Sequence, residues 1–411
     1  MKPRLRARVV TVMLLCILTG ILTFNSGVSA TASDAGVEFI KIGRGNATLV
    51  KSTSGSTTIY GLVDAGTSSQ YTSYVNPYLT AALGSAKLTF IAVTHGDSDH
   101  AGGIVLAIND FANSNTKLFL KDVAGNTSGK EKDVYQINLA MKNAAKAKHM
   151  PIVKIRPYSS ISASSVNSIS DIRNLSDSKF MAKYEIFTRN SSGSYVSDGT
   201  LYNTYTFGRF TITFYNGNNW NKTNFISSHN GGWDENVNAT PIKLRCTTST
   251  GKIYTTYLGS DLGENSYQGY SYEIADRVAD IVGHVSIYQV AHHGFYNSIK
   301  PDTTAAHLNP KYAIVTTSYN NLVNTYYENK GITDPDSSDL SAATSTIKRV
   351  CKATDLIKVY FTNGKGNPPD NRIINVLAEN NYALLNWTGT TIKSGSVKFS
   401  FTGNSMSVVQ G

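Results

Sequence analysis

The strongest constraint on this chain is an apolar run that ends in a dense group of polar residues. Residues 88–93 (Leu-Thr-Phe-Ile-Ala-Val) predict a strand buried on both faces, and residues 104–108 predict the start of a helix. The motif His-Gly-Asp-Ser-Asp-His occupies residues 95–100 between them. This mixture of imidazoles and carboxylates suits Zn, Mn or Fe better than Ca or Mg. A polar turn whose aspartates cap the next helix is the alternative, but so dense a ligand motif favours a metal site.

Further candidate metal ligands follow two other predicted strands. Asp261 comes after the predicted strand at residues 253–258, and the pair His292 and His293 comes after the next predicted strand. Side chains at the carboxyl ends of separate strands can converge on one crevice. Together with the motif they exceed the ligand number of one tetrahedral ion. The sequence therefore predicts two divalent metal ions, Zn or Mn, about 3.5–4 Å apart.

The order of these residues predicts how they share the two ions. His95 and Asp97 are expected to hold the first ion, and Asp99 and His100 the second. The carboxylate of Asp261, which has two oxygens, is the expected bridge. Such a pair of ions can deprotonate a shared water near neutral pH, so a metal-bound hydroxide is the expected nucleophile. The same site can polarise a carbonyl, which leaves phosphoester and amide hydrolysis open.

One histidine of the adjacent pair His292 and His293 is expected to complete the set of metal ligands. We predict that His292 binds metal and that His293, with Asp97 and Asp99, belongs to the catalytic residues, although the reverse assignment of the two histidines stays open. The third ligand of the first ion is also open, and His229 in a polar loop is a candidate. The other histidines lack neighbouring ligands and are expected at the surface or in the core: His149, His284 and His307.

The first thirty residues predict a signal peptide. An apolar stretch at residues 9–24 is followed by a cleavage motif of small residues at 28–30. The stretch is short for a membrane span, so we expect a secreted, extracellular protein with no stable span after cleavage. An uncleaved N-terminal anchor is the alternative. The basic residues that precede the apolar stretch are Lys2, Arg4, Arg6 and Arg8.

The charge of the mature chain is moderately basic. Removing residues 1–30 takes away those four basic residues and no acidic one, so the formal net charge falls from +10 to +6. This excess is compatible with a polyanionic substrate, such as nucleic acid or a phosphate-bearing wall polymer. Nothing in the sequence identifies a protein partner. Cys246 and Cys351 could pair in an oxidising compartment or remain free thiols.

The order of predicted elements defines the fold class. The mature chain opens as a β-meander, continues with alternating strands and helices, and ends in a second β-rich stretch, which is typical of a two-sheet α/β fold with helices outside. Residues 31–378 are expected to form one domain. Polar segments interrupt it at about 156–236 and predict surface insertions. Residues 379–411 predict a β-rich C-terminal extension packed on the same domain.

These motifs together resemble the metallo-β-lactamase superfamily, and in particular its ComEC-like branch, named for the extracellular hydrolase domain of competence DNA-uptake channels. The resemblance implies the αββα four-layer sandwich and a metal-dependent hydrolase. Asp97 stands where the wider superfamily usually has His and where the ComEC-like branch commonly has Asp. The matching segments occur in the family's order: Gly43-Arg44-Gly45-Asn46-Ala47, Asp64-Ala65-Gly66, residues 95–100, Ser260-Asp261-Leu262 and His292-His293-Gly294.

The sequence departs from the ComEC-like pattern at three positions. Arg44 and Asn46 replace the usual Gln and Asp, and Phe295 replaces Ser. In the family these positions line the substrate side, so they bear on substrate choice.

We therefore expect a secreted dinuclear hydrolase of phosphodiesters, most simply a nuclease-like enzyme. A hydrolase of teichoic-acid-type wall phosphodiesters is an alternative, and so is a non-catalytic surface or binding protein on the same fold. A β-lactamase is less favoured, because Asp97 makes the first metal site richer in oxygen than a three-histidine site.

Overall fold

Two large β-sheets organise the part of the chain that the computed structural model describes. It comprises residues 34–123, 129–224, 234–263, 269–300, 303–333, 337–363, 384–388 and 391–411, all within the unit Ser33–Gly411. The predicted signal peptide, His229 and the predicted boundary between residues 378 and 379 lie outside these ranges. Among the described residues, no helix is both long enough and apolar enough to cross a membrane.

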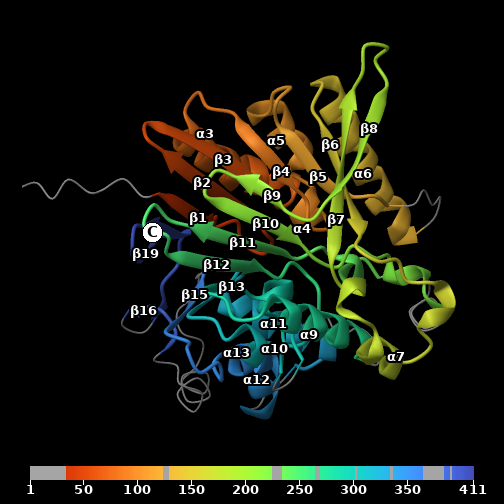
Figure 1. The fold of residues 1–411 in the computed structure, drawn as a ribbon. Coiled ribbons are helices and arrows are strands. Elements are labelled where there is room, and N and C mark those ends of the chain that lie inside the picture. Colours follow the sequence, from red (N-terminus) through yellow and green to blue (C-terminus); the bar gives the residue numbers. More distant parts are fainter. Residues whose placement is uncertain are drawn as a thin grey trace, which may run out of the picture. The chain divides into compact units, whose positions relative to one another are not determined.

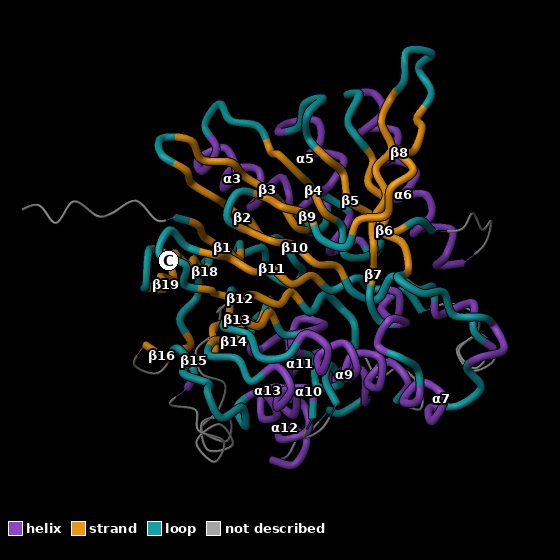
Figure 2. Tube along the Cα trace, viewed as in Figure 1, coloured by secondary structure: helices purple, strands orange, loops and turns teal. Residues whose placement is uncertain are grey.

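The first sheet has ten strands among the described residues, and it contains both ends of the described chain (Figures 1 and 2). The strands at its centre are parallel to their neighbours, whereas those toward both edges are antiparallel. The strand order is β19 (Ser405–Gln410), β18 (Val397–Thr402), β1 (Ala35–Phe39), β2 (Thr48–Ser54), β3 (Thr57–Val63), β4 (Leu88–Ala92), β5 (Lys117–Lys121), β6 (Ile152–Pro157), β7 (Ala182–Arg189) and β8 (Tyr195–Tyr202).

The second sheet has seven strands in the described part of the chain. The predicted strand at residues 253–258 is confirmed, and it pairs antiparallel with the strand at residues 242–247. The strand order is β15 (Lys358–Phe361), β14 (Tyr312–Val315), β13 (Ile287–Gln289), β12 (Ile253–Leu258), β11 (Ile242–Thr247), β10 (Phe210–Phe214) and β9 (Tyr205–Phe207). A short separate pair is formed by β16 (Trp387–Thr388) and β17 (Thr391–Ile392).

Helices cover the outer face of each sheet (Figure 1). Those on the first sheet are α2 (Ser68–Gln70), the π-helix η1 (Tyr71–Val75), α3 (Asn76–Leu83), α4 (Ser98–Ala101), α5 (Ile104–Phe111) and α6 (Gly129–Ala147). Those on the second sheet are α9 (Tyr270–Val282), α10 (Thr304–Leu308), α11 (Tyr319–Lys330), α12 (Ser337–Ala343) and α13 (Ser345–Val350). Short helices elsewhere are η2 (Ala163–Ser165), α7 (Ile169–Asn174), η3 (Asp177–Lys179), η4 (Trp220–Lys222), η5 (Asn236–Asn238) and η6 (Ala291–Gly294).

Three hydrophobic clusters fill the spaces between these layers. In β4, Phe90 belongs to the cluster between the two sheets, together with Leu244 of β11. Its neighbour Ile91 points to the opposite face, where it joins the cluster under the helices with Ile104 of α5. Because successive side chains of a strand alternate between faces, a strand covered on both sides is apolar throughout. The predicted αββα four-layer sandwich is thereby confirmed.

The segments predicted as polar insertions have two different environments. Strands β7 and β8 lie in the first part of the predicted insertion. They are regular strands of eight residues each and extend the first sheet. Most of the described residues in 216–224 and 234–236 are buried, although Lys222 and Asn224 are exposed, and Trp220 is fully enclosed. Its Nε1–H donates to Asn216 Oδ1, and Asn216 Nδ2 donates to the carbonyls of Val237 and Ala239 at 2.9 and 2.7 Å. Buried amides of this kind hold the loop that carries Glu235 in place.

The two cysteines of the described chain are free. Cys246 is buried in β11, and Cys351 is partly buried after α13. Burial raises the pKa of both thiols to about 12, which makes them poor nucleophiles near neutral pH.

Candidate metal centre

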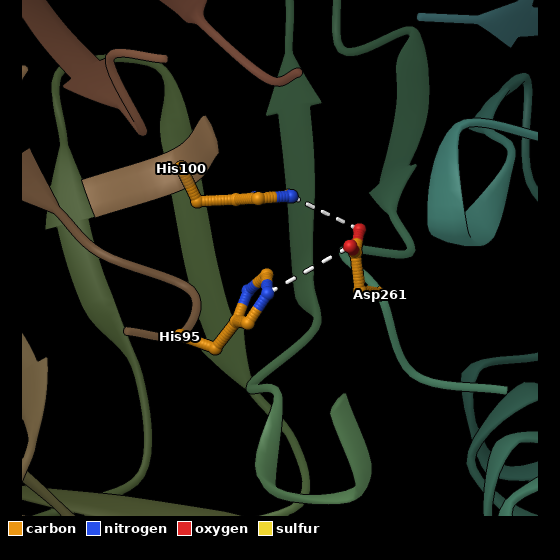
Figure 3. Close-up of side chains that lie close together, drawn as sticks. All are labelled: His95, His100 and Asp261. Carbon is orange, nitrogen blue, oxygen red and sulfur yellow. Dashed lines mark ion pairs between the residues drawn. The ribbon is translucent and has the colours of Figure 1, made fainter. Parts of the chain in front are cut away.

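The predicted ligands come together where strands of both sheets end. His95 follows β4, Asp261 follows β12, and His293 follows β13. His100 lies on α4, directly after the β4 loop. This cluster of side chains, which we call the candidate metal centre, lies between the two sheets (Figure 3).

The carboxylate of Asp261 lies at the middle of the candidate metal centre. Its Oδ1 is 3.0 Å from His100 Nε2, and its Oδ2 is 3.7 Å from His95 Nε2 (Figure 3). His293 Nε2 lies 3.5 Å from the same Oδ2. One carboxylate thus contacts three imidazoles, as a bridging ligand between two ions would.

Asp99 extends the cluster on the side of His293. The Oδ2 atom of Asp99 lies 3.3 Å from His293 Nε2. Two groups of three residues could each hold an ion. Within each group, every residue offers one ligand atom, and the three atoms lie within 4.8 Å of one another. These groups are His95, His100 and Asp261, and Asp99, His100 and His293.

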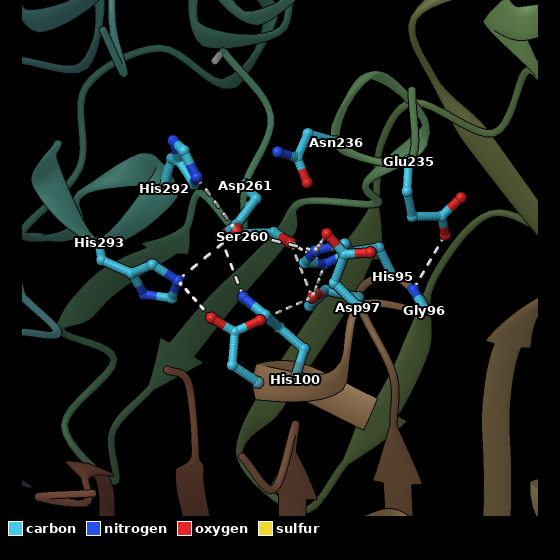
Figure 4. A network of polar contacts seen from close by, with 12 residues as sticks. His95, Gly96, Asp97, His100, Glu235, Asn236, Ser260, Asp261, His292 and His293 are labelled. Carbon is cyan, nitrogen blue, oxygen red and sulfur yellow. Dashed lines mark hydrogen bonds and ion pairs between the residues drawn. The ribbon is translucent and has the colours of Figure 1, made fainter. Parts of the chain in front are cut away.

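Two predicted site residues lie at the edge of this cluster. Asp97 Oδ2 is 3.9 Å from His95 Nε2, and the Asp97 side chain is 20% exposed. His292 Nε2 is 4.0 Å from Asp261 Oδ2, and its side chain is 14% exposed (Figure 4). Neither joins a group of three among the described residues. His293, which is buried, is therefore the better placed of the two neighbouring histidines for binding an ion.

Asp64, at the end of β3, orients His100. Its Oδ1 accepts the backbone N–H of Thr94 at 2.8 Å, and its Oδ2 accepts the Thr94 hydroxyl at 2.7 Å. His100 Nδ1 lies 2.9 Å from the same Oδ2. A carboxylate on one ring nitrogen fixes the tautomer and leaves the other nitrogen for a metal. Sequence reasoning found Asp64 only as part of a family motif and gave it no role.

Hydroxyl groups hold the other two histidines of the cluster. His95 Nδ1 lies 3.2 Å from Ser260 Oγ, and His293 Nδ1 lies 3.0 Å from Thr316 Oγ1. In each ring the Nε2 atom is the one that faces Asp261. Sequence reasoning named Ser260 only as part of a family motif and missed Thr316, because a single hydroxyl after a strand carries no recognisable spacing.

Glu235 fixes the loop that bears the motif. Its Oε1 accepts a hydrogen bond from the backbone N–H of Gly96 at 2.9 Å, and the residue is 3% exposed (Figure 4). Gly96 itself packs against α6, and a Cβ atom at this position would lie 2.3 Å from Val134 Cγ1. Position 96, between His95 and Asp97 of the motif, is therefore a glycine for steric reasons.

The backbone is strained at this centre. Four non-glycine residues here have φ between 45° and 56°, in the left-handed region: Asp64, Ser260, His292 and His293. Such conformations cost about 1–3 kcal/mol each and persist where the surroundings enforce them. The two consecutive strained histidines form the kink in η6 that turns the buried His293 inward.

Burial and charge set the protonation of the candidate ligands. Burial lowers the pKa of His95 and favours its neutral form. Burial opposes the charged form of His100 too, but the carboxylates of Asp261 and Asp64 outweigh it and raise the His100 pKa. Burial likewise disfavours the Asp261 carboxylate, yet His100 and His293 hold its pKa well below the usual range.

The donor set fits a divalent transition metal. Within the described residues, the buried His95 Nε2 atom makes no hydrogen bond, while His100 Nε2 and Asp261 Oδ1 face each other at 3.0 Å. Buried polar atoms normally have a partner, so His95 Nε2 points to a missing one. Imidazole nitrogens with carboxylate oxygens suit Zn or Mn.

A cation stands at the mouth of the candidate metal centre. Arg44 Nε lies 3.7 Å from Asp99 Oδ2, and the Arg44 side chain is 54% exposed. Its guanidinium lies 5.4 Å from the ring centre of Phe295. Phe295 in turn contacts the His292 ring edge to face, at 5.2 Å between centroids. Two of the three departures from the family pattern thus lie together beside the candidate ligands.

Residues 40–115 match the family model of the Metallo-beta-lactamase superfamily. None of the curated proteins matches the sequence. This match supports the superfamily, and with it a hydrolase that depends on divalent metal ions, often zinc. The matched segment contains the β4 loop and most of the candidate ligands, but not Asp261 or His293.

Several solved structures are similar to the chain at low identity. Metallo-beta-lactamase SMB-1 bound to 2-mercaptoethanesulfonate is 12% identical, with a TM-score of 0.31, and the alignment covers 78% of this chain and 95% of that one. MEM-A1, a subclass B3 metallo-beta-lactamase from a soil metagenome library, is 13% identical, with a TM-score of 0.30 and coverage of 64% and 78%. MIM-1 from Novosphingobium pentaromativorans is 10% identical, with a TM-score of 0.28 and coverage of 80% and 95%. Likeness at this level carries no argument about activity.

Proposed function

We propose that this protein is a secreted phosphodiesterase that uses two divalent metal ions to cleave nucleic acid. The observation that carries the choice of a phosphodiester is the exposed Arg44 guanidinium, 3.7 Å from Asp99 at the mouth of the candidate metal centre. A cation in that place can bind a non-bridging oxygen of an anionic diester. An uncharged amide has no such charge to present.

The candidate ligands divide between the two ions in the proposed site. His95 and Asp97 would hold the first ion, Asp99, His100 and His293 would hold the second, and the Asp261 carboxylate would be available to both. This arrangement follows the contacts of Asp261 with three imidazoles and the contact between Asp99 and His293. It assigns metal binding to His293 and leaves His292 at the rim. When bound, the ions supply a Lewis acid and lower the pKa of water.

The chain's own residues position the reaction. Asp64 and the hydroxyl of Ser260 keep the Nε2 atoms of His100 and His95 directed at Asp261. Glu235 fixes the loop that connects His95 to His100, because its carboxylate accepts a hydrogen bond from the backbone N–H of Gly96. Arg44 orients the diester, with its guanidinium lying near the Phe295 ring. Rigid support of this kind holds reacting groups within the small tolerances that catalysis requires.

A substrate panel tests the proposal. Protein loaded with Zn or Mn is incubated with single- and double-stranded DNA, RNA, bis-p-nitrophenyl phosphate, a poly(glycerol phosphate) wall polymer and a chromogenic β-lactam. We expect cleavage of nucleic acid and of the small diester, and loss of both in Asp261→Asn. Cleavage of the wall polymer without nucleic acid would replace the substrate class, and lactam cleavage alone would overturn the proposal. Secretion is tested by N-terminal sequencing of protein recovered from the medium, which should lack residues 1–30.

A further inference from the structure

A cavity rich in cations lies beside the candidate metal centre. It has a volume of about 570 Å³ and opens at the ends of β5 and β6 and along the 217–222 loop. We call it the basic cavity. Its cationic lining residues are Lys142, Lys154, Arg156 and Lys222, Asp122 is the acidic one, and the Lys121 amine also lines it.

The positive charge of the basic cavity is not balanced by its own residues. Three cations share the Asp122 carboxylate: Lys142, Lys154 at 3.0 Å and Arg156 at 3.6 Å. Arg156 also binds Glu185 through Nε and Nη2, at 3.1 and 3.0 Å. A cavity with an excess of one charge raises the local concentration of ligands of the opposite charge.

The basic cavity adjoins the candidate metal centre. A smaller cavity of about 20 Å³ is lined by His95 and Gly96 of the metal motif and also by Lys121 and Asn219, which line the basic cavity. In the described part of the chain, the buried Oδ1 atom of Asn219 has no hydrogen-bond partner. It therefore offers an acceptor to a hydroxyl or amino group of a ligand at the wall that the two cavities share.

We propose that the basic cavity binds the phosphates of a single-stranded nucleic acid whose scissile bond lies at the candidate metal centre. This inference rests on the proposed function and names where the substrate strand runs. A cavity of this volume suits a ligand of small-molecule size, and so takes a flexible strand rather than a rigid duplex.

A second basic cavity provides a matched control. It has a volume of about 640 Å³ and is lined by Lys146, His149 and Arg189, among others. None of its described lining residues belongs to the metal motif or to the basic cavity. Charge alone would make both cavities bind a polyanion, whereas adjacency to the candidate metal centre favours only the first.

The test measures the affinity of the metal-loaded protein for a phosphorothioate oligonucleotide that resists cleavage. Lys154→Gln/Lys222→Gln removes two cations and leaves Asp122 paired with Lys142 and Arg156. We expect binding weakened about tenfold, and the slope of log Kd against log salt reduced by about 1 to 1.5. Lys146→Gln/Arg189→Gln should bind like the unmodified protein. If the first double variant fails to fold, Lys222→Glu alone serves, because this side chain is exposed.

The outcomes separate this inference from the proposed function. Equal loss of affinity in both double variants, or no loss in either, overturns the inference. Binding of poly(glycerol phosphate), but not of oligonucleotide, in a manner that depends on Lys154 and Lys222 also overturns it, since the strand would then be a wall polymer. Hydrolysis of bis-p-nitrophenyl phosphate by the unmodified protein tests the proposed function separately. If the unmodified protein does not hydrolyse this diester but Lys154→Gln/Lys222→Gln binds the oligonucleotide more weakly, the proposed function fails. The inference of a nucleic-acid binding site then stands without catalysis.

Discussion

The carboxylate of Glu235 accepts a hydrogen bond from the backbone N–H of Gly96, although the two residues are 139 positions apart. The bond joins the loop before η5, which leads into the second sheet, to the motif that follows β4 in the first sheet. Its loss should loosen the candidate metal centre.

Glu235→Ala should destabilise the protein. The buried N–H of Gly96 would lose its acceptor, and an unsatisfied buried donor costs about 1–3 kcal/mol. Glu235→Gln keeps an acceptor oxygen and should lose less. Urea unfolding measures the change, and Glu328→Ala on the exposed face of α11 is the control. An Ala variant as stable as the control would show that the bond contributes nothing.

Gly96→Ala should be destabilising, and Val134→Ala should compensate it. The added methyl would lie 2.3 Å from Val134 Cγ1, and overpacking of this kind costs about 1–3 kcal/mol. Shortening Val134 removes the atom that clashes. A double-mutant cycle, read by thermal unfolding and by metal content, should therefore show a favourable coupling between the two substitutions. Additive losses would mean that some other contact excludes a side chain at position 96.

His293→Ala and His292→Ala should differ in metal content. His293 contacts both Asp99 and Asp261, whereas His292 contacts Asp261 at 4.0 Å from the rim. We expect about two ions per chain in the unmodified protein, about one in His293→Ala and no change in His292→Ala. Elemental analysis of dialysed protein provides the measurement. The opposite pattern would restore the assignment of metal binding to His292.

Arg44→Gln should raise KM for the small diester more than it lowers kcat. The guanidinium binds the ground-state anion as well as the transition state in the proposed site, and uniform binding appears in KM. The expected loss in kcat/KM is about tenfold or more. Arg44→Lys should restore part of the affinity, because it keeps the charge. Unchanged kinetics in Arg44→Gln would remove the argument for a phosphodiester substrate.

Lys121→Met should flatten the dependence of stability on pH. The Lys121 ammonium donates to the carbonyls of Asn216 and Asn238, both at 2.9 Å, and burial lowers its pKa to about 7, with Glu235 opposing the shift. Above that value the unfolded chain binds more protons than the folded one, so stability rises with pH. Between pH 7 and 8.5, the free energy of unfolding should rise by about 1.5 kcal/mol more in the unmodified protein than in the variant. Parallel curves in urea titrations would show that the amine is not enclosed.

The candidate ligands were accessible to sequence reasoning because each follows a recognisable strand. The apolar run of β4 and the alternation in β12 predict where those strands end, and polar residues at such ends converge. The structure brings His95, Asp99, His100, Asp261 and His293 close together. Which of the two neighbouring histidines points inward depends on the kink in η6, and no local pattern encodes that kink.

The supports of the candidate metal centre could not be predicted in this way. Glu235 lies in an Asn-rich segment that predicts a surface loop, yet Glu235 itself is buried, as is Trp220 of the same segment. Its contact with Gly96 depends on how the two sheets stack, and this is set by packing rather than by local periodicity. The pairing of β18 with β1 likewise joins segments that are far apart in the sequence.

That pairing has a consequence for the order in which the chain can fold. Strand β1 has β2 on one side and β18 on the other, so one edge of β1 stays open until residues near 400 have been synthesised. An unpaired strand edge is a site of aggregation, and contacts of such long range form slowly. A nascent chain therefore completes its first sheet only after almost all of it has emerged. Deleting β18 and β19 should leave a protein that associates through β1.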